Sequence, residues 1–349
     1  MKAHDASRRH ARLPSAESNP EPLNWPHLIL LLALPAYALL TWHWGWSHEL
    51  TLAAGTLLAL AWLMLCERLR PGRADWQASA ADMRRDASSL GLAALVDTLF
   101  SLAANLAALA WREHSMLGAA QTGISLWLQQ GWQVLPLPIA LVLVIAVGEF
   151  LPYWLHRWAH ERPALWRWHA LHHWPTAVNT SNSVLVHPFN LLWNKLGRWL
   201  PWLLLQVPAD LMLWAALFVQ AQELAAHANV AGSLRGLRVW LGGADLHRWH
   251  HSVLLNEAGN YGTVVPWWDW VFGSGFHPNR QGPAHVGWAA GSWRPERLHL
   301  RELICGPLPG KSGRGSVSAE PNSDPHTATN RSRKRGGDSP APRAERHRC

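Results

Sequence analysis

Four long apolar runs constrain the fold of this chain more than any other feature. They cover Leu28–Trp42, Leu50–Leu65, Leu90–Trp111 and Leu135–Trp154. With their flanking residues, such runs are long enough to cross the hydrocarbon core of a bilayer as helices. Hydrophobic residues make up 49% of the sequence and charged residues only 15%, which disfavours a soluble protein with one large core. We therefore expect an all-α polytopic membrane protein with about four transmembrane helices.

The basic residues predict how these helices are oriented. Arginines are present before the first run and throughout the polar segment Glu67–Ser88, whereas the loop between the first two runs carries no lysine or arginine. Because basic loops stay on the cytoplasmic side, we expect the N-terminus and Glu67–Ser88 to face the cytoplasm. Four spans then return the chain to that side at His156. The excess of arginine over lysine and the frequent alanine are typical of bacterial chains, so the expected location is a bacterial inner membrane.

A fifth apolar stretch, Leu196–Leu224, is interrupted by Pro201 and Pro208 and has basic residues on both sides. This pattern favours a re-entrant helical hairpin that enters and leaves the membrane on the same face. A simple fifth span is disfavoured, because it would separate the last histidine cluster from the first two. The expected organisation is a polar N-terminal segment (1–25), three transmembrane helices with an Arg-rich loop (26–133), a catalytic domain with a cytoplasmic histidine-rich helical cap (134–280), a short extension (281–305) and a disordered basic tail (306–349).

The formal net charge of +8 does not predict binding to nucleic acid. Many of the basic residues lie in loops and at the two termini, and the apolar part of the chain shows no basic face interleaved with aromatic residues. We expect the membrane, and no nucleic acid, as a partner.

Three short histidine clusters follow the fourth apolar run. Their sequences are His156-Arg-Trp-Ala-His160, His169-Ala-Leu-His172-His173 and His247-Arg-Trp-His250-His251. Residues three or four apart share one face of a helix, and neutral imidazole is a common ligand for late first-row metals. No cysteine lies near a cluster, and the Glu-x-x-His pairs of soluble di-iron bundles are absent. The clusters therefore predict an all-imidazole dinuclear site, with oxygen activation by iron as its chemistry.

On these residues the sequence resembles the fatty acid hydroxylase superfamily, also called the sterol desaturase family, of membrane di-iron oxygenases. The resemblance covers roughly residues 145–275. It rests on the motifs Tyr153-Trp-Leu-His-Arg-Trp-Ala-His160, Leu165-Trp-Arg-Trp-His-Ala-Leu-His-His173, His187-Pro188, His227-Ala-Asn229, Leu246-His-Arg-Trp-His-His-Ser252, Asn260-Tyr-Gly262 and Trp268-Asp-Trp-Val-Phe-Gly273. Two positions depart from the common pattern, since Trp174 replaces a serine and Leu185 an arginine. Neither is an expected ligand.

The resemblance implies two iron ions as cofactors, with zinc as the metal that isolation could introduce, and molecular oxygen as co-substrate. No catalytic residue is expected apart from the metal ligands. The implied ligands are His156, His160, His169, His172, His173, His227, His247, His250, His251 and His187. Nearby polar residues are candidates for orienting the imidazoles, which metal sites normally require: Glu149, Asp245, Asn229 and Asn260.

The implied reaction is oxidation of a C–H bond in a lipid, such as a fatty acyl chain or a sterol. Hydroxylation is favoured over desaturation, which uses the same site. Because no dinucleotide-binding, haem-attachment or iron–sulfur motif is present, an external electron donor is expected, namely a reductase with a ferredoxin or a cytochrome. Three alternatives remain open: a zinc-binding membrane protein without oxygenase activity, a metal transporter and an inactive scaffold. The transporter is disfavoured because the spans carry almost no ionisable residue apart from Asp97.

Overall fold

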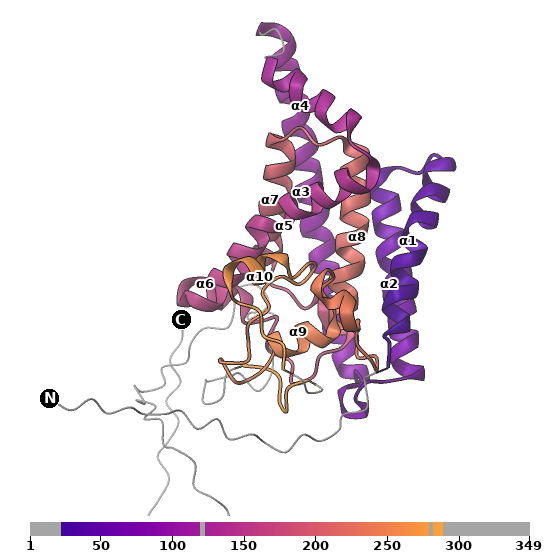
Figure 1. Cartoon of the computed structure of the whole chain (residues 1–349), viewed down its shortest axis with the longest axis vertical. Helices are drawn as coiled ribbons and strands as arrows, with labels where there is room; N and C mark the ends of the chain where they lie inside the picture. The colour runs from indigo at the N-terminus through magenta and orange to yellow at the C-terminus, as the bar shows by residue number, and fades with distance from the viewer. Residues whose placement is uncertain (1–21, 119–122, 279–281, 289–349) are drawn as a thin grey trace, which may run out of the picture. The chain divides into compact units, whose positions relative to one another are not determined.

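The computed structural model describes residues 22–118, 123–278 and 282–288, and every regular element in them is a helix (Figure 1). Only isolated β-bridges, and no strands, are found among these residues. The predicted basic tail lies outside the described residues, as do nearly all of the predicted N-terminal segment and most of the extension over 281–305.

Four helices are long and apolar enough to cross a membrane, as the sequence predicted. They are α1 (Trp25–His43), α2 (His48–Leu69), the first part of α3 (Ala80–Gly118) and α5 (Leu137–Glu161). The expectation of an all-α polytopic membrane protein is therefore confirmed.

Helix α3 begins well before the predicted third span, within the segment Glu67–Ser88. The reason is a reciprocal cap at its start. The Ser79 hydroxyl accepts the N–H of Asp82 at 3.2 Å, and the Asp82 carboxylate accepts the N–H of Ser79 at 3.1 Å. Such a capping box satisfies two backbone donors that the first turn leaves unpaired. Residues 80–88 of the Arg-rich segment are consequently helical rather than loop.

The apolar stretch with two prolines forms a helical hairpin. Helix α7 (Pro188–Leu204) and helix α8 (Ala209–His227) are joined by a short turn in which the N–H of Val207 donates to the carbonyl of Trp202 at 2.9 Å. Helix α7 packs against α5, and α8 packs against α2 (Figure 1). The start of α7 and the end of α8 each carry a histidine of the predicted set, so the hairpin returns to the histidine end of the molecule. Its depth in a bilayer remains a prediction.

Two apolar cores hold the long helices together. One, around Leu63 and Leu224, joins α1, α2 and α8, and the other, around Val144, Trp202 and Val219, joins α5, α7 and α8. The short helices α6 (Pro163–His169), α9 (Ala244–His250) and α10 (Trp267–Phe272) lie at one end of these long helices (Figure 1). The remaining elements are α4 (Gly123–Val134), η1 (Ala74–Trp76), η2 (Thr180–Val184) and η3 (Arg235–Val239). Together the short elements and the ends of α5 and α8 bring the histidines to one place.

Candidate metal centre

The three histidine clusters differ in local structure. His156 and His160 lie one turn apart near the end of α5, as their spacing predicts. In the second cluster, α6 ends at His169, and the next two histidines occupy the turn that follows. In the third cluster, α9 ends at His250, and His251 is its C-cap. A change from helix to turn within a cluster alters where consecutive side chains point. This local geometry determines how the histidines are distributed between two separate groups.

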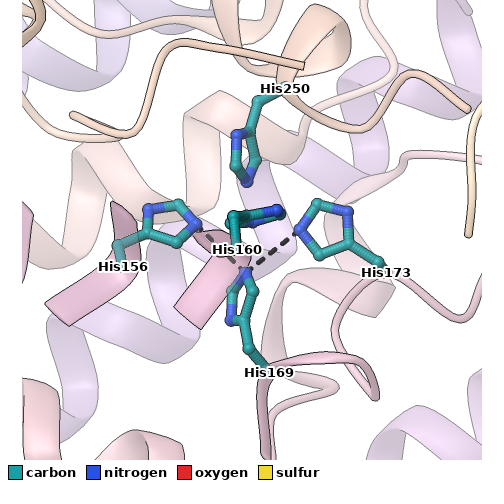
Figure 2. Close-up of side chains that lie close together, drawn as sticks. All are labelled: His156, His160, His169, His173 and His250. Atoms are coloured by element: carbon teal, nitrogen blue, oxygen red, sulfur yellow. Dashed lines mark hydrogen bonds between the residues drawn. The ribbon is translucent and has the colours of Figure 1, made fainter. Parts of the chain in front are cut away.

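Five imidazoles form a first group (Figure 2), and their ligand nitrogens all lie within 4.8 Å of one another. The group consists of His156, His160, His169, His173 and His250. At its centre, Nε2 of His169 lies 3.0 Å from Nε2 of His156 and 3.0 Å from Nε2 of His173. Figure 2 shows the five rings arriving from different sides around a common point.

Four imidazoles form a second group with the same separation limit of 4.8 Å: His172, His227, His247 and His251. Their Nε2 atoms form a chain of short approaches. Nε2 of His227 lies 3.1 Å from that of His172 and 2.9 Å from that of His247, which in turn lies 3.1 Å from Nε2 of His251. Helix α8 therefore contributes His227 to a site otherwise built from the second and third clusters.

The two groups are neighbours, and consecutive residues supply opposite groups. His172 belongs to the second group and His173 to the first, while His250 belongs to the first and His251 to the second. The rings of His173 and His251 stack with their centroids 4.2 Å apart. The arrangement is that of a paired site rather than one enlarged cluster.

Backbone carbonyls fix which nitrogen of two imidazoles faces the first group. Nδ1 of His156 lies 2.7 Å from the carbonyl oxygen of Tyr261, and Nδ1 of His250 lies 2.9 Å from that of Gly259. Because a carbonyl only accepts, each Nδ1 carries the hydrogen, and each Nε2 presents a lone pair to the interior of the group.

The interior of the first group suits a cation. The buried Nε2 atoms of His160 and His250 have no hydrogen-bond partner among the described residues. Buried acceptors that converge without donors are unfavourable, and a metal ion relieves this directly. The residues present therefore fit a metal.

Side-chain amides orient one histidine in each group, and the sequence analysis missed both. Nδ1 of His169 lies 2.7 Å from Oδ1 of Asn190, and Nδ1 of His227 lies 3.1 Å from Oδ1 of Asn182. The Asn182 amide is itself fixed, because its Nδ2 donates to the carbonyl of Ala177 at 2.8 Å. The available signal was weak: both asparagines lie within five residues of His187.

Of the predicted ligands, His187 is the one that lies in neither group. It is the N-cap of α7, and its Nδ1 accepts the N–H of Phe189 at 3.0 Å. Glu149, a predicted orienting residue, instead accepts a hydrogen bond from Arg198 at 2.7 Å, and Arg198 also contacts Glu223.

Two of the other predicted orienting residues, Asn229 and Asn260, hold the backbone around the site. The Asn229 side chain accepts the N–H of Arg73 at 2.9 Å and donates to its carbonyl at 2.8 Å. Asn260 adopts a positive φ of 59° and pairs with both backbone groups of Phe276. Asp245 lies in the first turn of α9, two residues before His247.

Burial keeps the imidazoles neutral. It lowers the pKa of His172 to about 3, with the neighbouring His156 adding to the effect. Burial first, and then the other histidines, also lower the pKa well below the ordinary range for His169, His173, His247, His250 and His251. Metal binding requires the neutral form, so these histidines are ready to bind a metal at neutral pH.

A buried carboxylate supports the loop beside the first group. Asp269 accepts the N–H groups of Tyr261 and Gly262 at 2.8 and 2.7 Å and the Ser274 hydroxyl at 2.7 Å. Burial raises its pKa, although these hydrogen bonds oppose the rise. A Cβ on Gly262 would lie 2.4 Å from the carbonyl oxygen of Val265, so the turn leaves no room for a side chain. Asp269 thereby fixes the carbonyl that orients His156.

The fold and the site define a polytopic membrane protein with a paired all-histidine centre, and the comparisons with known proteins agree with that class. The family description "Fatty acid hydroxylase" matches residues 141–274. An ornithine lipid hydroxylase of Rhizobium tropici is 30% identical over 288 residues, which cover 79% of this chain and 81% of the relative. The chain belongs to the fatty acid hydroxylase family, whose members are oxygen-dependent oxidoreductases that act on lipids.

Two plant relatives match a shorter region. Methylsterol monooxygenase 2-2 of Arabidopsis thaliana is 29% identical over 38% of this chain, and the very-long-chain aldehyde decarbonylase GL1-11 of Oryza sativa is 30% identical over 40%. These matches span 51% and 56% of the plant proteins. No solved structure matches the chain.

Proposed function

We propose that the two histidine groups hold two iron ions and that the protein uses molecular oxygen to hydroxylate a C–H bond of a membrane lipid. The observation that carries this proposal is the convergence of buried Nε2 lone pairs, at 3.0 Å between His156 and His169, with their Nδ1 atoms engaged outward. The proposed ligands are His156, His160, His169, His173 and His250 for one ion and His172, His227, His247 and His251 for the other.

Bound iron would supply the activation of oxygen and the oxidation of the C–H bond. The protein's own part is to hold nine neutral imidazoles in place, and hydrogen bonds at Nδ1 do so for His156, His169, His227 and His250. Overall, the lipid, one oxygen molecule, two electrons and two protons give the hydroxylated lipid and one water.

The two electrons require an external donor, which we propose to be a reductase with a ferredoxin or a cytochrome. We propose that the histidine end faces the cytoplasm at a bacterial inner membrane, which the positive-inside rule applied to the basic loops supports. A soluble donor could reach the site from there.

We propose a polar membrane lipid as the substrate, with ornithine lipid as the first compound to test. A relative that matches 79% of this chain is named as an ornithine lipid hydroxylase. Because α5 carries both a membrane span and His156 and His160, we propose that the lipid approaches the site from the bilayer.

The decisive experiment compares lipid extracts from a bacterial host that makes ornithine lipid and expresses either the intact protein or the variant His172→Ala. Mass spectrometry should show a lipid heavier by one oxygen atom only with the intact protein. Loss of two hydrogens instead would indicate desaturation, and identical extracts would contradict both activities. His43→Ala is the matched control, because His43 is exposed in the last turn of α1 and belongs to neither group.

The metal is tested separately on purified protein in detergent. Reconstitution with ferrous iron under anaerobic conditions, followed by addition of oxygen and an electron donor, should restore product formation. Activity that zinc supports without oxygen would overturn the oxygenase proposal.

A further inference from the structure

Glu67 is a buried carboxylate of helix α2, and it lies outside residues 141–274, which the family description matches. One of its oxygens accepts three hydrogen bonds. Oε1 accepts the N–H of Thr180 at 2.6 Å, the hydroxyl of Thr180 at 2.7 Å and the N–H of Asn229 at 2.6 Å.

The segments that Glu67 holds are the two that position His227. Thr180 opens the short helix η2, which carries Asn182, and the Asn182 side chain binds Nδ1 of His227. Asn229 follows His227 by two residues, directly after α8 ends. One carboxylate oxygen thus holds both the short helix η2, which carries Asn182, and the backbone that follows His227 at Asn229.

The segment after His227 is also held from its other side. The guanidinium of Arg248 donates to the carbonyls of Ala228 and Val230, each at 2.8 Å. Arg248 follows His247, another member of the second group. The backbone at Asn229 therefore lies between Glu67 and the helix that carries the third cluster, so loss of Glu67 would release His227 relative to His247.

We infer that Glu67 is a positioning residue for the second histidine group, through which a transmembrane helix outside the matched region sets metal affinity at that group alone. The inference rests on the proposed function, in that the second group must bind a metal ion. It gives α2 a role in the site that the histidine motifs do not reveal.

The test is a titration of full-length, metal-free protein in detergent with cobalt(II), which is stable in air and gives an absorption spectrum that reports its ligands. Intact protein should bind two cobalt ions per chain. Glu67→Ala should weaken one of the two sites by about tenfold or more, as loss of outer-sphere partners of metal ligands typically does, and leave the other unchanged. Glu67→Gln retains an acceptor oxygen at Oε1 and should restore most of the affinity.

Leu63→Ala is the matched control, because Leu63 is fully buried one turn earlier on α2 and packs in an apolar core. It should lower the thermal stability without changing either cobalt site. If Glu67→Ala does not stay monodisperse, Thr180→Val, which removes only the hydroxyl donor, should weaken the same site to a smaller extent. Two unchanged cobalt sites in Thr180→Val and in a folded Glu67→Ala overturn this inference alone. An intact protein that binds no cobalt at either group overturns the proposed function as well.

Discussion

The two histidine groups are built from the same clusters but are supported by different parts of the chain. In the first group, His156 and His250 are oriented by the backbone carbonyls of Tyr261 and Gly259. In the second group, His227 is oriented by the Asn182 amide. Glu67 in turn binds Thr180, which lies in the same short helix as Asn182. One site thus depends mainly on the conformation of a loop, the other on polar side chains from distant elements.

This difference indicates which substitutions should change metal binding at one site and leave the other unchanged. A carbonyl cannot be removed by changing a side chain, so the first group should resist most outer substitutions unless the loop itself moves. The second group should respond to single side chains at Asn182 and Glu67. The following predictions test this contrast.

The largest effect is expected where adjacent residues serve opposite groups. His250→Ala and His251→Ala should each reduce the hydroxylated lipid to the level of cells without the protein, because each removes a ligand from one of two ions that act together. Metal analysis should show about one iron per chain in each variant. His250→Ala should lose the ion of the first group, and His251→Ala the ion of the second. Full activity in either variant would contradict a paired site.

A second prediction compares the two orienting asparagines. Asn182→Ala should weaken metal binding at the second group by about 10–100-fold, and Asn190→Ala should weaken it at the first group by less than this, because each leaves one imidazole without its Nδ1 partner. Cobalt titration measures both sites in one experiment. Asn190→Ala should be the milder change, since carbonyls still orient His156 and His250. Equal losses at both sites in either variant would show that the groups are not separately supported.

A third prediction concerns the loop that serves the first group. Asp269→Asn replaces an acceptor oxygen with an amide nitrogen, so one of its donors, such as the N–H of Gly262, loses its partner. The free energy of unfolding in denaturant should fall by about 1–3 kcal/mol, the cost of an unpaired buried donor. Metal affinity should fall at the first group alone. A loss of metal affinity confined to the second group would show that this loop supports the second group and not the first.

The smallest effect concerns pH and should be common to both groups. Burial lowers the pKa of His172 to about 3, whereas in the unfolded chain the pKa returns to its ordinary value of 6.5. Between these values the unfolded state binds a proton that the folded state does not. The contribution of His172 to the free energy of unfolding is therefore fully present above pH 6.5 and is lost as the pH falls toward 3. In metal-free protein, His172→Gln should reduce the slope of unfolding free energy against pH by at most about 1.4 kcal/mol per unit.

His173→Gln, in the first group, is the companion measurement, because burial lowers the pKa of His173 as well. Its slope should change in the same direction. A slope that stays at the value of the intact protein in both variants would show that these imidazoles are not buried in the neutral form.

The spans and the histidine clusters could be predicted because their signals are local. An apolar run and a dense set of imidazoles are visible within twenty residues, and helical spacing correctly placed His156 and His160 on one face. The start of α3 was missed because its cap at Ser79 and Asp82 lies inside a segment whose charge suggested a loop.

The division of the histidines could not be predicted, since it depends on where a helix ends. His172 and His173 follow the end of α6, and the turn there sends consecutive side chains to opposite groups. The partners of the imidazoles were equally hidden. Every residue has a backbone carbonyl, so the sequence does not indicate that the carbonyl of Tyr261 binds an imidazole. Glu67 lies 160 residues before His227 in the chain, so no local pattern connects the two. Among the sequence candidates, Glu149 was chosen for its proximity in sequence, and the structure pairs it with Arg198 instead.

Helix α5 carries both a bilayer span and two residues of the first histidine group, and Pro152 lies inside it before His156. Its 25 residues are about 37 Å long, some 7 Å more than the hydrocarbon core of a typical bilayer. The surplus is close to the length of the segment from His156 to the end of the helix. We expect a membrane of different thickness to be accommodated in part by tilting or kinking of α5, which would move His156 and His160 relative to the histidines on the short helices. We therefore expect the geometry of this site to respond to the acyl composition of the bilayer that surrounds it.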